Sequence, residues 1–255
     1  MIQFFVYNGK EKLAYNDFGN DRGFPILVQH GAIASIKDID LFEKLEPYAR
    51  IIYIARPGYG ESSPVILRNM LEYGIIVSKL AEYLALDEFD VLSISAGAPY
   101  GYAAAKACPE KTRNIYVYSG VPALYDAEVQ KDWPVPVSND LTMAECQKTA
   151  HEAFFAGLPE AALENNAIKD SMANNCFGEA QNIRIRFRDW GFKLPEINSR
   201  VFMRHSKKDG PYGMVIRTAE LLPHGELELL EDGEHFTKEG FESFIEKTVI
   251  KALQK

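Results

Sequence analysis

The chain has 255 residues, of which 47% are hydrophobic and 25% charged, and its 28 Lys and Arg residues against 36 Asp and Glu residues give a net charge of −8. These proportions are globular and exclude a disordered, collagen-like or low-complexity chain. The acidic balance argues against a nucleic acid or an anionic membrane as partner, because both require a basic surface. Apolar runs in the sequence are all shorter than the roughly 20 residues that cross a bilayer.

The start of the chain and its cysteines indicate where the protein works. Met1 to Asn8 lack the basic start and the long apolar stretch of a secretion signal. Cys108, Cys146 and Cys176 are odd in number and are spaced like neither zinc ligands nor a disulfide framework. We therefore expect a cytoplasmic protein without a metal or another cofactor, whose cysteines pack as small apolar residues.

The first half of the chain alternates β-rich runs with helical ones. Runs 2–7 and 12–18 meet at Asn8-Gly9, which is the strongest short signal for a β-hairpin. Continuous apolar runs are typical of strands buried on both faces, and apolar residues at helical spacing predict amphipathic helices. On these grounds we expect strands at 25–30, 51–55, 89–94 and 114–119, with helices at 37–48, 68–86 and 96–107.

The alternation stops near Gly120 and resumes later, with strands expected at 200–204 and 226–230 and helices at 213–222 and 236–253. Alternating strands and helices predict a mostly parallel sheet covered by helices. Residues 121–195 hold about three helical stretches and few β-rich runs, and they are too long for a loop. We predict that they form an inserted helical cap on a core domain made of residues 1–120 and 196–255.

The most informative motif is small-x-Ser-x-Gly, centred on Ser95 between an expected strand and an expected helix. A serine at such a place lies on a strained strand-to-helix turn, which exposes its Oγ and points the helix N-terminus at it. The residues two before and two after must be small, and here they are Ser93 and Gly97. Ser93 is the poorer candidate, because Val91 would then fall on a position that needs a small residue. Ser95 is the predicted nucleophile.

A serine hydroxyl needs a base that takes its proton, and the base needs a carboxylate that orients it. His235 follows strand 226–230, at the carboxyl edge where open α/β sheets build their sites. Asp209 follows strand 200–204 at the same edge. The chain order serine, aspartate, histidine is that of one hydrolase fold, so we predict a triad of Ser95, Asp209 and His235.

Acyl transfer also needs donors for the developing oxyanion. The peptide directly after the nucleophile supplies one, the main-chain N–H of Ala96. The second is expected from the loop after strand 25–30, where His30-Gly31 support the main-chain N–H of Ala32.

At this point the sequence resembles the α/β-hydrolase superfamily along essentially its whole length. The motifs that carry the resemblance are His30-Gly31, the loop Arg56-Pro-Gly-Tyr-Gly-Glu-Ser62, Ser95, Asp209 and His235. Ser95-Ala-Gly-Ala-Pro-Tyr-Gly-Tyr and Asp189-Trp-Gly-Phe look like the small bacterial serine esterases of that family. The resemblance implies an eight-stranded, mostly parallel sheet with flanking helices, and residues 121–195 in the place of the variable cap. A serine nucleophile is unlike the aspartate of haloalkane dehalogenases and epoxide hydrolases.

Other side chains compete less well for a role. Three further histidines, His151, His205 and His224, have no matching pattern of partners. The same holds for two rival acids, Asp126 and Asp232. Three cap arginines at short spacing are typical of a solvated face; they are Arg184, Arg186 and Arg188. Four aromatic residues could line a substrate pocket, although packing explains them as well; they are Tyr100, Trp133, Phe154 and Phe155.

These observations predict a serine hydrolase of small carboxylic esters that acts through an acyl-enzyme intermediate, with a small ester-like molecule as its partner. Two alternatives stay open. One is a hydrolase of C–C, lactone or amide bonds with the same triad, and the other is a ligand-binding homologue that keeps the fold without turnover.

Overall fold

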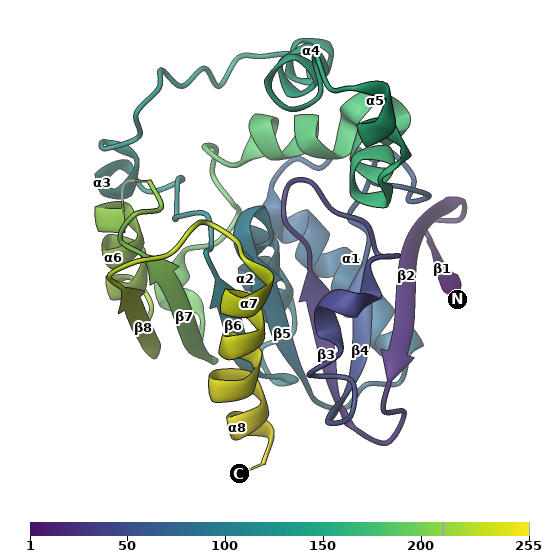
Figure 1. The fold of residues 1–255 in the computed structure, drawn as a ribbon, viewed down its shortest axis with the longest axis vertical. Coiled ribbons are helices and arrows are strands. Elements are labelled where there is room, and N and C mark those ends of the chain that lie inside the picture. Colours follow the sequence, from purple (N-terminus) through teal and green to yellow (C-terminus); the bar gives the residue numbers. More distant parts are fainter. Residues whose placement is uncertain (211, 255) are drawn as a thin grey trace.

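The computed structural model describes residues 1–210 and 212–254, and in this part of the chain an eight-stranded sheet forms the centre of the molecule (Figure 1). The strand order is β1-β2-β4-β3-β5-β6-β7-β8. β2 runs antiparallel to both of its neighbours and the other neighbouring strands are parallel. The strands are β1 (Ile2–Tyr7), β2 (Glu11–Gly19), β3 (Phe24–Gln29), β4 (Ala49–Ile54), β5 (Phe89–Ile94), β6 (Thr112–Tyr118), β7 (Arg200–Ser206) and β8 (Gly225–Leu230).

The hairpin at the start of the chain is confirmed. Asn8 and Gly9 connect β1 to β2 with φ angles of 47° and 83°. Two consecutive left-handed residues match the twist of paired strands, which explains why this dipeptide occupies the turn.

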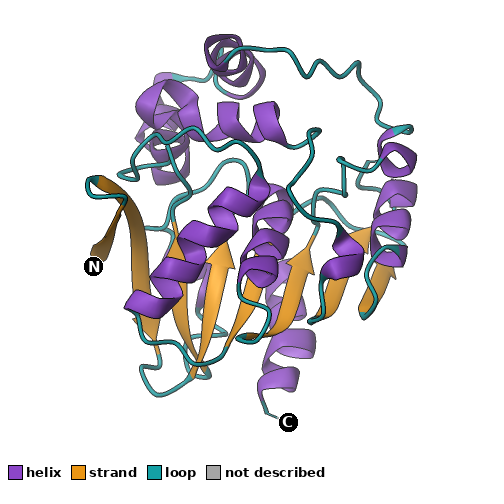
Figure 2. Ribbon diagram, turned by 180° about the vertical axis from the view of Figure 1, so that it is seen from behind, coloured by secondary structure: helices purple, strands orange, loops and turns teal. Residues whose placement is uncertain are grey.

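Helices cover both faces of the sheet (Figures 1 and 2). One face carries α1 (Met70–Tyr83) and α2 (Ala98–Ala107), and the other carries α7 (Lys238–Phe244), a π-helical turn (Ile245–Ile250) and α8 (Lys251–Leu253). Successive strand residues point to opposite faces. Val91 accordingly packs in the core beneath α1 and α2, and Leu92 packs in the core beneath Phe241 of α7. The remaining helix outside the cap, α6 (Tyr212–Glu220), contacts β7 and β8.

The sheet places a crevice between β3 and β5. From β3 the chain continues to β4 on one side and then crosses back to β5 on the other side. In open α/β sheets a reversal of this kind leaves a gap between the two departing loops at the carboxyl ends of the strands. The loop after β3 and the turn after β5 therefore face each other at one edge.

Two expected helices differ from the observed ones. Within 37–48 only a 3-10 turn forms, at Ile39–Phe42. The side chains of Ser35, Lys37 and Asp38 bond to the cap instead, and the main chain before Ile39 follows those contacts. The helix expected at 236–253 begins at Lys238 and contains the π-helical turn.

Residues 121–195, the predicted cap (called the cap from here on), lie in helices, turns and loops. They include α3 (Ala127–Gln130), α4 (Met143–Phe154) and α5 (Asn166–Ile185), and Figure 1 shows α4 and α5 above the edge of the sheet. α4 packs on α5 around a small cluster of Ala150, Phe155 and Cys176. None of the helices described combines the length and the apolarity that a membrane span requires.

α5 is bent in its middle. Asn174, Asn175 and Cys176 have φ angles of 53°, 58° and 57°, which are left-handed values. Asparagine tolerates this conformation better than most residues do. The bend divides α5 into a first half that reaches the loop after β3 and a second half that crosses above the sheet.

Candidate active site

The turn after β5 exposes Ser95. Its φ is 51°, and a 3-10 turn of Ser95–Gly97 leads directly into α2. A Cβ on Gly97 would lie 2.3 Å from the main-chain oxygen of Gln29, and a Cβ on Gly101 would lie 2.0 Å from the Oγ of Ser93. The turn thus packs against the main chain of β3, and this contact explains why the sequence around Ser95 is so rich in small residues.

The structure brings Ser95, Asp209 and His235 together. The Nε2 of His235 lies 2.7 Å from the Oγ of Ser95, and its Nδ1 lies 2.6 Å from Oδ2 of Asp209. A carboxylate only accepts, so Nδ1 carries the proton and Nε2 is left to accept the proton of the serine hydroxyl. The three side chains come from loops after β5, β7 and β8, and these loops meet at one edge of the sheet.

His205 supports Asp209, a role that the sequence analysis missed. Its Nε2 lies 3.0 Å from the main-chain oxygen of Asp209 and 3.4 Å from Oδ2. Burial lowers the pKa of His205, so the ring is neutral near pH 7 and donates from Nε2 to the main-chain oxygen. The signal available in the sequence is the spacing, since His205 lies near the end of β7, four residues before the acid.

The loop after β3 approaches the nucleophile. A Cβ on Gly31 would lie 3.6 Å from the Cβ of Ser95, and both Ala32 and Ala96 line the cavity beside the serine. The residues of the two predicted oxyanion donors therefore belong to the wall of the same cavity. Stabilising an oxyanion requires donors that converge on the point where charge develops, and this arrangement is compatible with that role.

His30 and Arg56 hold this loop from below. The main-chain N–H of Arg56 donates to Nε2 of His30 at 3.2 Å, so Nδ1 of His30 carries the ring proton and donates to the Gly31 oxygen at 2.8 Å. The guanidinium of Arg56 donates to the main-chain oxygens of His30 and Gly31. Burial, and then the charge of Arg56, hold the pKa of His30 well below its usual value. His30 is thus a neutral, structural residue.

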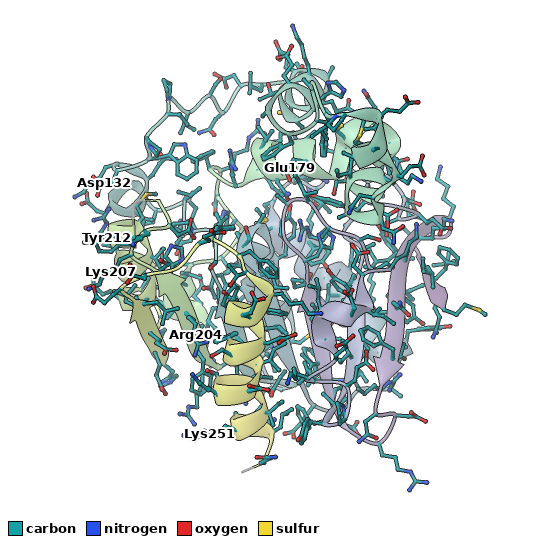
Figure 3. All side chains as sticks on the ribbon, viewed as in Figure 1. Asp132, Glu179, Arg204, Lys207, Tyr212 and Lys251 are labelled. Atoms are coloured by element: carbon teal, nitrogen blue, oxygen red, sulfur yellow. The ribbon has the colours of Figure 1, made fainter. Side chains whose placement is uncertain are left out.

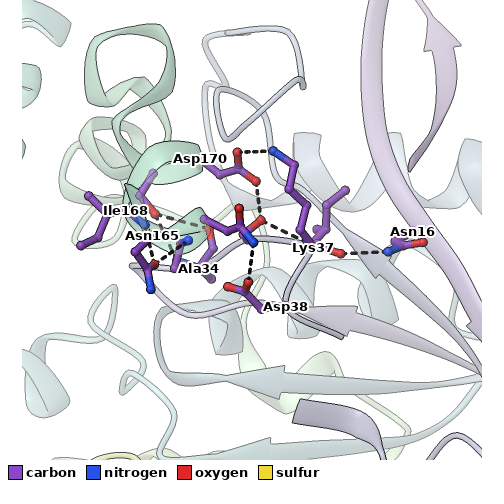
Figure 4. Close-up of polar contacts among 12 residues, drawn as sticks. Asn16, Ala34, Lys37, Asp38, Asn165, Ile168 and Asp170 are labelled. Atoms are coloured by element: carbon purple, nitrogen blue, oxygen red, sulfur yellow. Dashed lines mark hydrogen bonds and ion pairs between the residues drawn. The ribbon is translucent and has the colours of Figure 1, made fainter. Parts of the chain in front are cut away.

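The first half of α5 fastens the same loop from above. Asp170 of the cap accepts from the Ser35 hydroxyl at 2.5 Å and from the Lys37 ammonium at 3.0 Å (Figure 4). Ser171, the next residue, accepts from the main-chain N–H of Ala34 at 3.1 Å. The loop that carries the predicted oxyanion donor is consequently bonded on both sides.

A cavity of about 530 Å³ opens beside Ser95. Most of its wall is apolar, and its residues are Gly31, Ala32, Ile33, Ala34, Ser35, Asp38, Leu41, Tyr53, Ile94, Ser95, Ala96, Val121, Phe154, Ala167, Glu179, Arg186, His235 and Phe236. A volume of this size suits a small organic molecule.

Of the four aromatic residues expected in the pocket, the described wall includes Phe154 but not the others, and the expectation is corrected for those three. Tyr100 is buried in α2, where its hydroxyl donates to Asn182 at 2.6 Å. Phe155 packs inside the cap, and Trp133 packs edge to face with Phe187. Each of them fills the interior between elements, which helical spacing in a sequence does not distinguish from a pocket wall.

Two charged residues of the cap line the cavity and were not expected there. Glu179, labelled in Figure 3, is 1% exposed, and its Oε2 accepts from Tyr59 at 3.0 Å and from Asn182 at 2.6 Å. Burial raises the pKa of Glu179. Arg186 lies just beyond the end of α5 and is partly buried, which corrects its interpretation as part of a solvated face.

No group of three or more His, Cys, Asp or Glu side chains that could hold a metal ion occurs within residues 1–210 and 212–254. The three cysteines are buried and unpaired among these residues.

Comparisons with known proteins establish the fold. No family model matches the chain. An uncharacterized hydrolase of Bacillus subtilis (strain 168), YcgS, is 29% identical over 125 residues, which cover 49% of this chain and 41% of that protein. Among solved structures, an esterase from Exiguobacterium antarcticum superposes over 100% of both chains with a TM-score of 0.74 at 18% identity. An enol-lactonase from Burkholderia xenovorans LB400 superposes over 99% of this chain and 100% of its own, with a TM-score of 0.67 at 14% identity.

The chain has the α/β-hydrolase fold. In this α/β-hydrolase fold, the predicted nucleophile, acid and base occupy loops after β5, β7 and β8, and the predicted oxyanion loop follows β3. The fold expected from the sequence is confirmed by both the topology and the superpositions.

Proposed function

We propose that the protein is a serine hydrolase that cleaves small carboxylic esters. One observation carries the proposal. His235 lies between Ser95 and Asp209. Its Nε2 is 2.7 Å from the serine Oγ, and its Nδ1 is 2.6 Å from the carboxylate. A base within hydrogen-bond distance of a hydroxyl, itself oriented by an acid, is the arrangement that turns serine into a nucleophile.

The reaction follows from these positions. The Oγ of Ser95 attacks the ester carbonyl while Nε2 of His235 takes the hydroxyl proton. The main-chain N–H groups of Ala32 and Ala96 stabilise the oxyanion, and the imidazolium then returns the proton to the departing alcohol. Water, deprotonated by His235, attacks the acyl-serine, and collapse of the second tetrahedral intermediate releases the acid and restores Ser95.

The surroundings support an ester substrate. The cavity beside Ser95 is largely apolar, which suits the carbon skeleton of a small ester. An esterase and an enol-lactonase share the fold, so lactone hydrolysis by the same triad is the second candidate. The two reactions differ only in whether the alcohol stays attached to the acyl group.

The test measures release of p-nitrophenol from p-nitrophenyl butyrate. The Ser95→Ala variant is expected to lose on the order of 10⁴-fold in kcat. Ser93→Ala is the matched control, because Ser93 lies two residues away and its buried Oγ has no hydrogen-bond partner in the described chain. Equal rates for wild type and Ser95→Ala would overturn the proposal.

A labelling experiment separates an enzyme from a homologue that only binds ligands. A fluorophosphonate reacts with a serine whose proton is taken by a neighbouring base. Wild type and Ser93→Ala should be labelled and Ser95→Ala should not. A wild-type protein that resists labelling would favour the binding role.

A further inference from the structure

The guanidinium of Arg186 lies close to two aromatic rings at the wall of the cavity. Its Cζ lies 5.3 Å from the ring centroid of Trp133 and 5.0 Å from that of Phe187. Such cation–π contacts place the charge near the rings but supply no acceptor oxygen to its N–H groups. Because Arg186 lines the cavity that holds Ser95, this arrangement presents donors to whatever the cavity contains.

These donors have no partner in the described protein. The guanidinium of Arg186 makes no hydrogen bond or ion pair with residues 1–210 or 212–254, and its Nε is buried without an acceptor. The arginines on either side also have an unpaired Nε, but their terminal N–H groups are bonded. Arg184 donates to the main-chain oxygen of Leu67, and Arg188 donates to that of Asn139. Unpaired donors of a partly buried guanidinium are unfavourable for stability, and an acceptor on a bound ligand would complete them.

We propose that Arg186 binds a carboxylate of the substrate, so that the preferred substrates are esters or lactones that carry a free carboxylate away from the bond that is cleaved. This inference rests on the proposed function and names its substrate class. A carboxylate matches the two parallel N–H groups of a guanidinium with its two oxygens. A phosphate would bring a further charged oxygen to a wall that is otherwise mostly apolar.

The two acidic residues of the wall repel a substrate that carries a carboxylate. They are Asp38 and Glu179, and the Oε2 of Glu179 already accepts from Tyr59 and Asn182. It forms no ion pair with Arg186 in the described chain. A carboxylate in direct contact with the guanidinium is closer to the positive charge than to Glu179, and Coulomb attraction grows as the separation shrinks. The favourable contact therefore dominates.

The rest of the wall sets the body of the substrate. Residues on several sides of the cavity are apolar, among them Ile33, Leu41, Ile94, Val121 and Phe154. Such a wall favours a hydrocarbon chain or ring between the two polar ends of the molecule. The expected substrate thus has an acyl group at Ser95, an apolar middle and a carboxylate at Arg186.

The experiment compares two p-nitrophenyl esters of equal chain length. The mono-p-nitrophenyl ester of adipic acid ends in a carboxylate, and p-nitrophenyl hexanoate ends in a methyl group. Adipate is chosen because shorter dicarboxylic monoesters bring their own carboxylate within reach of the ester. The measured quantity is the ratio of kcat/KM for the anionic ester to that for the neutral ester, because a general loss of activity cancels in this ratio.

For the wild type the ratio should exceed one, and Arg186→Gln should lower it by about tenfold or more, the range of one charge-assisted bidentate contact. Arg186→Lys keeps the charge without the paired donors and should give an intermediate ratio. Arg188→Gln makes the same chemical change nearby, outside the cavity, and should keep the wild-type ratio.

The outcomes separate the two proposals. Turnover of the hexanoate ester with a wild-type ratio at or below one, or with a ratio that Arg186→Gln leaves unchanged, would overturn the carboxylate site and leave the esterase proposal intact. Failure of the wild type to hydrolyse either ester, together with no labelling by a fluorophosphonate, would overturn the proposed function itself.

Discussion

The hydroxyl of Ser171, in the cap, accepts a hydrogen bond of 3.1 Å from the main-chain N–H of Ala34, in the loop after β3. The same hydroxyl lies 3.5 Å from the main-chain oxygen of Ala32. Ser171 is fully buried at this junction. One side chain of α5 therefore fixes the peptide groups on both sides of Ile33, next to the predicted oxyanion donor.

Removing this hydroxyl should loosen the loop without touching the substrate. We expect Ser171→Ala to lower kcat for p-nitrophenyl butyrate by about threefold to tenfold, because misplacing a donor weakens its contact with the transition state. Ser138→Ala, an exposed cap serine, serves as the control and should retain wild-type kcat. A Ser171→Ala variant with wild-type kcat would show that the loop holds its position through its other contacts alone.

Asp209 and Asp232 are both candidates for the acid on sequence grounds, and the structure distinguishes them. Asp209 contacts His235, whereas Asp232 pairs with Lys208 at the surface. Asp209→Asn should lower kcat by about 10³-fold to 10⁴-fold, because an amide no longer favours the ring tautomer that accepts the serine proton. Asp232→Asn should keep wild-type kcat in the same assay. A larger loss in Asp232→Asn than in Asp209→Asn would contradict the assignment of the acid.

The buried, neutral His30 predicts how stability depends on pH. In the unfolded chain a histidine takes up a proton below its ordinary pKa of 6.5, but the folded protein holds the pKa of His30 well below that value. The unfolded state then binds the extra proton, so the free energy of unfolding should fall as the pH drops below 6.5, by at most about 1.4 kcal/mol per pH unit for this one group.

Denaturant unfolding of wild type and His30→Gln between pH 5 and pH 8 checks this dependence. The lost hydrogen bonds destabilise the variant at pH 8, and this difference should shrink as the pH falls, because glutamine does not titrate. A difference that stays constant over the whole range would show that His30 has the same pKa in the folded and the unfolded protein.

Much of the fold follows from short segments of the sequence. Asn8-Gly9 predicts its hairpin because few residue pairs adopt two left-handed conformations, and the apolar runs of β3 and β5 are typical of strands covered on both faces. The helix predicted at 37–48 was wrong for a physical reason. Ser35 and Lys37 bond to Asp170, which lies more than 130 residues later in the chain, and local periodicity carries no information about such a contact.

The sequence predicts the triad, but it does not predict that Arg186 lines the cavity. Ser95 lies in a turn whose strain restricts its neighbours, so its sequence surroundings are distinctive, and the order of strands places Asp209 and His235 at the same edge. Arg186 has no such local mark. Its spacing from Arg184 and Arg188 looks like a surface pattern, and only the folded structure shows that it lines the cavity, next to Trp133 and Phe187.

The left-handed residues Asn174 to Cys176 separate two duties of a single helix. The half before the bend carries Ser171, which bonds to the loop after β3, and the half after it carries Glu179, which lines the cavity. Under the proposed function, a substitution at Glu179 would change the wall that meets the substrate while the bond between Ser171 and the loop stays in place.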